Sequence, residues 1–102
     1  MKIDTNTLNK NFDNRNRLLV MSLLSVNKSL SFNELKESLQ LTDGNLASTI
    51  KALEELQYLS VMKGFIGRKT NTLYTITQDG KQAFEVHLQA LDNLIKSTQK
   101  IN

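Results

Sequence analysis

The sequence predicts a mainly helical α+β fold with one small β-hairpin, and three observations carry this prediction. Apolar residues recur at helical spacing in segments 13–27, 31–40, 43–57 and from 80 onward. Segment 59–77 instead combines β-branched and aromatic residues with glycines, as two paired strands do. The length of 102 residues suits one domain built from these elements.

Composition limits the kinds of protein that the chain can form. It has no cysteine, which excludes disulfides and thiolate metal sites, and its 39% hydrophobic content is ordinary for a soluble protein. No apolar run approaches the roughly 18 residues of a membrane span, and nothing after Met1 resembles a signal peptide. We therefore expect a cytoplasmic protein with no membrane partner.

The first third of the chain predicts an arm and two helices. Residues 1–12 are polar and rich in asparagine, so we expect a flexible N-terminal arm that ends at most in a helical turn. Asp13 is a plausible N-cap for the first helix. Ser31 and Glu34 match a capping box at the start of the short second helix. Leu30 before it can add a brief strand.

The third helix, about 43–57, has one apolar stripe and one small, polar face. Thr42 or Asp43 can cap its start. The exposed face near the start carries small or polar side chains, and the acidic pair of residues 54–55 comes only near the other end. Such a face suits close approach to the major groove of DNA, although a merely solvated helix face has the same composition. The candidate DNA contacts in this helix are Asn45, Ser48, Thr49 and Lys51.

The hairpin carries a local excess of positive charge. Between Leu56 and Gln78 there is no Asp or Glu, while Lys63, Arg68 and Lys69 give +3, equal to the net charge of the whole chain. A positive segment in an otherwise balanced protein indicates a polyanionic partner. We read residues 67–71, GRKTN, as a five-residue connection between the strands. The candidate DNA contacts here are Lys63, Arg68, Lys69 and Thr70.

The last helix, within residues 80–102, is longer than a small core can cover. Thr77 is placed to cap it, and Asp79 lies in its first turn. About 20 helical residues span 30 Å, so its broad apolar band predicts a second surface to cover, most simply the same helix of another chain. The expected dimer interface contains Phe84, His87, Leu88, Leu91, Leu94 and Ile95.

The order of these elements predicts a winged helix-turn-helix with a long C-terminal dimerisation helix. In this interpretation residues 13–79 form the DNA-binding domain, with the recognition helix at about 43–57 and the wing, the hairpin that follows it, at about 59–77. Residues 80–102 form the dimerisation helix. The expected partners are double-stranded DNA, with an inverted-repeat operator, and a second copy of the chain.

Residues 41–91 also carry a family resemblance. The motif positions in this sequence are Thr42-Asp43-Gly44-Asn45-Leu46-Ala47, Leu53-Glu54, Lys63, Phe65, Gly67-Arg68-Lys69, Thr72, Thr77, Gly80 and Ala83-Phe84. In these positions the chain resembles the small winged-helix regulators related to the MarR and ArsR groups. The resemblance implies a dimeric transcription regulator whose long terminal helix, often with the first helix, forms the dimer interface. Ala47 and Thr70 depart from the family pattern, which commonly has serine and proline there.

Other classes of function fit the sequence less well. It has no cysteine, no Gly-rich phosphate loop and no carboxylate pair spaced for acid–base work, so we expect neither an enzyme nor a bound cofactor or metal. A winged helix that serves only as a protein-interaction or assembly module is the alternative. RNA binding is disfavoured because the major groove of A-form RNA is too narrow for a recognition helix. The sequence indicates no operator, regulated gene, direction of regulation or effector.

Overall fold

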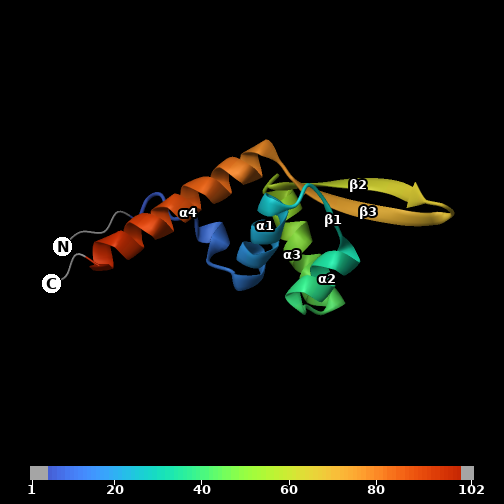
Figure 1. Ribbon diagram of the computed structural model, residues 1–102, viewed down its shortest axis with the longest axis horizontal. Coiled ribbons are helices and arrows are strands. Elements are labelled where there is room, and N and C mark those ends of the chain that lie inside the picture. Colours follow the sequence, from blue (N-terminus) through green and yellow to red (C-terminus); the bar gives the residue numbers. More distant parts are fainter. Residues whose placement is uncertain (1–4, 100–102) are drawn as a thin grey trace.

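The computed structural model describes residues 5–99 as one helical body with a long ribbon and a long helix (Figure 1). The ribbon consists of β2 and β3, and a third strand, β1, joins the sheet at the edge of β3. In chain order the elements are η1 (Lys10–Phe12), α1 (Arg15–Val26), β1 (Leu30–Ser31), α2 (Phe32–Leu39), α3 (Asp43–Glu55), β2 (Leu59–Ile66), β3 (Lys69–Ile76) and α4 (Gln78–Gln99).

The capping residues explain where several helices begin. Ser31 and Glu34 form the predicted capping box, in which each side chain accepts the other residue's backbone N–H. The Thr42 hydroxyl accepts the Asn45 N–H at 3.1 Å and starts α3. For α1 the N-cap is Asn14, one residue after the predicted Asp13.

The turn of the ribbon is tighter than the sequence suggested. Ile66 pairs directly with Lys69, so only Gly67 and Arg68 connect the strands, where we expected five residues. Gly67 has a φ of 63°, a left-handed conformation that glycine adopts without strain at the first position of a two-residue hairpin turn. Residues 69–71, expected in the connection, instead pair with β2, so β3 begins three residues earlier and the Ile66–Lys69 pair fixes the register of the tip.

The core lies between the helices and one face of the sheet. Val20 and Met21 of α1 and Leu53 of α3 are fully buried, and Leu59 and Tyr74 cover them from the sheet. The remaining buried apolar residues of this cluster are Phe12, Leu24, Leu35, Leu46, Ile50 and Phe84.

The N-terminal segment is more ordered than the predicted flexible arm. Phe12 is 3% exposed and its ring lies 5.6 Å from those of Tyr58 and Phe84. The Asn9 backbone N–H donates to Nδ1 of His87 at 3.0 Å, and the Asn9 side chain donates to the Tyr58 hydroxyl at 3.1 Å. Residues 5–12 are therefore attached to α4 and to the α3–β2 junction, while residues 1–4 of the expected arm lie outside the described residues.

The molecule is elongated because the ribbon and α4 project to opposite ends (Figure 1). Its extents are 61 × 26 × 20 Å and its radius of gyration is 15.9 Å, whereas a compact domain of this length has about 13 Å. Residues 100–102 of the predicted last helix lie outside the described residues. Within residues 5–99 no helix is both long and apolar enough to cross a membrane.

Candidate nucleic-acid interface

The first half of α3 presents a small, polar surface to solvent. Asn45, Ser48 and Lys51 are all exposed, and the Ser48 hydroxyl donates to the Asn45 carbonyl oxygen at 3.1 Å. Leu46 and Ile50 on the opposite side are buried in the core, so α3 cannot rotate to present another face. This surface therefore offers an amide, a hydroxyl and an ammonium group on a rigid helix.

Thr49, the fourth candidate contact of this helix, is buried and does not belong to this exposed surface. It is only 6% exposed, and its hydroxyl donates to the Asn45 carbonyl oxygen at 2.7 Å. The side chain lies on the flank of the apolar stripe, where a threonine satisfies its hydroxyl within its own helix.

A carboxylate at the start of α3 is paired. Asp43 lies 2.8 Å from the Lys36 ammonium of α2, and both side chains are substantially exposed. An exposed ion pair of this kind contributes little to stability. The Lys36 ammonium does offset the negative charge of Asp43 at the start of α3, which would otherwise repel a phosphate.

The ribbon presents unpaired positive charge. Lys63, Arg68, Lys69 and Thr70 are all exposed, as predicted for this segment. Among residues 5–99 the ion pairs are Lys36–Asp43 and Lys96–Asp92, so no carboxylate lies within 4.0 Å of a ribbon cation. The tip of the ribbon is thus a cationic projection on the far side of the molecule from α4 (Figure 1).

The comparison with known families decides what this arrangement is. A family model described as a winged helix DNA-binding domain matches residues 16–95, which run from α1 through the whole ribbon into α4. The chain belongs to this family. The match confirms the predicted fold class and the predicted resemblance, and the ribbon is the wing of a winged-helix protein.

Known relatives agree with this assignment. An uncharacterized protein of Methanocaldococcus jannaschii is 34% identical over 90 residues, which cover 88% of this chain and 98% of that protein. The solved structure of a transcriptional regulator homologue from Pyrococcus horikoshii is 28% identical, with a TM-score of 0.80 and coverage of 86% and 87% of the two chains. The family match and these relatives support a winged-helix protein that binds DNA and takes part in transcription regulation.

A more distant structure shows the same fold on DNA. Bacillus subtilis PadR, solved in complex with operator DNA, is 18% identical and has a TM-score of 0.64. The similarity covers 71% of this chain and 45% of PadR. At this identity it supports the fold alone.

In this winged-helix protein α4 divides the predicted interface residues into two groups. Phe84 and His87 are each 3% exposed and belong to the chain's own interior, because Phe12 and Asn9 cover them. The sequence pattern could not show this, since it gave the N-terminal segment no packing role. Leu88 and Ile95 are 46% and 54% exposed. Leu91 and Leu94 are half-buried, and Val86, which the prediction omitted, is 46% exposed.

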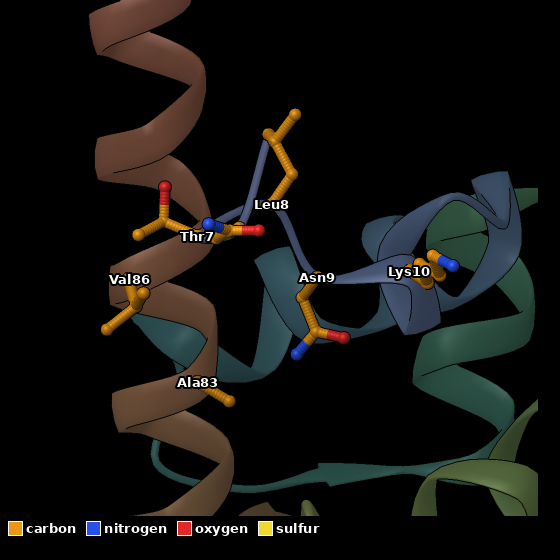
Figure 2. A pocket seen from close by; sticks show the side chains of 7 residues that line it. Thr7, Leu8, Asn9, Lys10, Ala83 and Val86 are labelled. Carbon is orange, nitrogen blue, oxygen red and sulfur yellow. The ribbon is translucent and has the colours of Figure 1, made fainter. Parts of the chain in front are cut away.

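An open hollow lies where the N-terminal segment crosses α4 (Figure 2). Its volume is about 440 Å³. Figure 2 shows Ala83 and Val86 on α4 and Thr7 to Lys10 on the N-terminal segment beside it. Among the described residues that line it, only Lys10 has a charged side chain, so this part of the lining holds no cluster of charges that would select an ionic ligand.

Proposed function

We propose that the protein is a dimeric, sequence-specific double-stranded DNA-binding regulator of transcription. In this proposal α3 enters the major groove and the wing contacts the phosphate backbone or the minor groove. The observation that carries it is the combination of an exposed polar half of α3 with a cationic wing that has no carboxylate partner among residues 5–99. A regulator of this kind works in the compartment that holds the DNA, so we still expect the protein in the cytoplasm.

The exposed residues of α3 have the chemistry that base edges and phosphates require. The Asn45 amide can pair with an adenine edge through a donor and an acceptor, and the Ser48 hydroxyl can serve either kind of base. Lys51 lies further along the helix and suits a phosphate contact. Gly44 adds no side chain, and a Cβ there would meet nothing within 4 Å, so the helix can approach DNA closely.

The wing supplies contacts that do not depend on base identity. Arg68 lies in the turn itself and Lys69 directly follows it, so both reach further from the body than any other cation of the ribbon. Arginine also suits a narrow minor groove, where the negative potential is enhanced. Lys63 lies further from the tip, where it reaches the flanking backbone.

The apolar surface of α4 supports a dimer. Leu88 and Ile95 are seven residues apart on one stripe, with the half-buried Leu91 between them. A symmetric pairing of two such helices would bury this stripe and give a two-fold arrangement of two α3 helices. The operator of a dimer of this kind is an inverted repeat, with half-sites separated by about 34 Å or one turn of DNA.

Selection from a random-sequence duplex library tests the proposal. The protein is incubated with the library, bound duplexes are recovered and sequenced over several rounds, and the same is done with Asn45→Ala. The expected result is an enriched inverted repeat for the wild type and relaxed preference at one position of each half-site for the variant. The proposal would be contradicted if no sequence were enriched. It would also be contradicted if a single, unrepeated half-site were enriched and sedimentation showed the protein to be a monomer.

A further inference from the structure

The exposed large apolar side chains of the described residues gather at the two ends of the molecule. Three lie on α4, of which Leu88 and Ile95 belong to the proposed dimer stripe and Val86 borders the N-terminal segment, and one lies at the end of α1. The other three lie on the wing: Met62 at 63%, Phe65 at 75% and Ile66 at 69% exposure. Exposing large apolar side chains to water is unfavourable. The wing group needs a partner that the proposed dimer does not supply.

The strand register places Phe65 on a defined face of the wing. Phe65 is opposite Thr70, and Lys63 is opposite Thr72, so these four side chains share one face. Nearer the body, the same face carries Val61 and Tyr74, which pack on the helical core.

The face that carries Phe65 is thus the one that the helices, α3 among them, cover at the base of the wing. A duplex held against the outer side of α3 lies on this side of the wing. Phe65, together with Lys63, Gly64, Thr70 and Thr72, lines a hollow of about 350 Å³ there. Along β2, Met62 and Ile66 alternate with Lys63 and Phe65 and point to the opposite face.

We propose that the Phe65 ring is an apolar wedge that enters the minor groove of the bound duplex beside Arg68 and bends the DNA at that step. This inference rests on the proposed function and gives a DNA-contacting role to an apolar residue of the wing, in addition to its cations. The Arg68 side chain, three residues away in the turn, supplies the charge that brings the groove to the ring. Thr70, directly across the ladder, supplies a hydroxyl for a neighbouring sugar or phosphate oxygen.

The chemistry of the partner follows from the wedge. An apolar side chain between two base pairs unstacks them and kinks the duplex by about 20–90° toward the major groove. Pyrimidine–purine steps such as TA and CA unstack most readily. The wing therefore prefers a flexible step at its contact point, without forming a hydrogen bond to any base there. Because an apolar contact releases no counterion, Phe65 contributes to bending and leaves the salt dependence of binding unchanged.

The matched pair Phe65→Ala and Met62→Ala tests the wedge. Both positions are exposed on β2, but on opposite faces, so each variant loses a large apolar side chain without loss of core packing. A duplex recovered by selection is labelled with a donor and an acceptor dye at its ends, and energy transfer reports the bend when the protein is bound. A second preparation of the same duplex carries 2-aminopurine at the base step next to the Arg68 contact, and the fluorescence of this base rises when it unstacks. Anisotropy at two salt concentrations gives affinity and salt slope.

The expected result is a bend and a rise in 2-aminopurine fluorescence for the wild type and Met62→Ala. For Phe65→Ala both signals fall to those of the free duplex, while the salt slope is retained. A bend that survives in Phe65→Ala, or that is lost equally in Met62→Ala, overturns the wedge and leaves the proposed function intact. A wild type that binds no duplex overturns both. Circular dichroism of each variant checks that the fold is unchanged.

Discussion

Replacing Gly80 by alanine is expected to destabilise the fold, although the same change usually stabilises a helix. Gly80 lies in the first turn of α4 against the junction between α3 and β2. A Cβ there would lie 2.8 Å from the carbonyl carbon of Tyr58 and 2.9 Å from its Cα, and closer still to its carbonyl oxygen. These atoms are backbone, so no side-chain rotation relieves the overlap and α4 must move away.

That movement strains two hydrogen bonds that fix α4 to the junction. The Thr77 N–H donates to the Tyr58 oxygen at 3.1 Å, and the Thr77 hydroxyl donates to the Gln57 oxygen at 2.7 Å. We expect a cost of about 1–3 kcal/mol for overpacking and about 1 kcal/mol for each hydrogen bond, less about 1 kcal/mol of gained helix propensity. The net loss of unfolding free energy is about 2–4 kcal/mol, a large part of a typical total of about 5–15 kcal/mol.

Urea unfolding at fixed protein concentration measures this loss. We expect the midpoint for Gly80→Ala to fall by roughly 1–2 M. The matched control is Gly44→Ala in the first turn of α3, where a Cβ meets nothing within 4 Å. That variant should be as stable as the wild type or more stable by up to about 1 kcal/mol. Equal midpoints for Gly80→Ala and the wild type would refute the close approach of α4 to the junction.

Three further variants test other parts of the account. Leu88→Glu places a charge on the exposed apolar stripe of α4, and sedimentation equilibrium should show a monomer. Asn9→Ala removes the hydrogen bonds to Tyr58 and to the Asn11 N–H, and chemical unfolding should show a loss of about 1–2 kcal/mol. In the wild type burial raises the pKa of the Tyr74 hydroxyl above its ordinary 10.0, and the Glu54 carboxylate raises it further. The unfolded chain therefore loses this proton first, so stability should fall above about pH 10 in the wild type and less in Tyr74→Phe.

Each of these variants has an outcome that contradicts its premise. Gln89→Glu, on the polar side of α4, is the control for Leu88→Glu, and loss of the dimer in both would mean that charge alone disrupts it. Unchanged stability of Asn9→Ala would mean that the N-terminal segment is not fastened to the junction. Parallel pH profiles for the wild type and Tyr74→Phe would mean that Tyr74 ionises as readily in the folded state as in the unfolded chain.

Local signals in the sequence were sufficient for the order and type of the elements. Ser31 and Glu34 predicted the start of α2, and Thr77 the start of α4, because a cap depends on residues only three positions apart. The charge of the wing was equally readable, since Lys63, Arg68 and Lys69 have no acidic neighbour in sequence.

What the sequence did not predict depends on contacts between distant segments. His87 looked like part of the dimer stripe, because nothing local shows that Asn9, 78 residues away, donates a hydrogen bond to it. Thr49 was one of the candidate contacts, and its burial on the flank of the apolar stripe of α3 depends on packing against other elements. Phe65 appeared in the sequence only as a motif position. The structure shows that its side chain is exposed, and the register with Thr70 shows which face of the wing it lies on.

Fluorescence anisotropy tests the central claim, a DNA-binding protein whose wing supplies essential phosphate contacts. Mixed-sequence duplex DNA is titrated at about 50 and 200 mM salt with the wild type and Arg68→Glu/Lys69→Glu. A control, Lys10→Glu/Lys81→Glu, makes the same change in net charge away from the wing. The account predicts steep, salt-dependent binding by the wild type and the control, and a large loss in the wing variant. No binding by the wild type at the lower salt would contradict it and favour a protein-interaction module; undiminished binding by the wing variant would remove the wing from the mechanism.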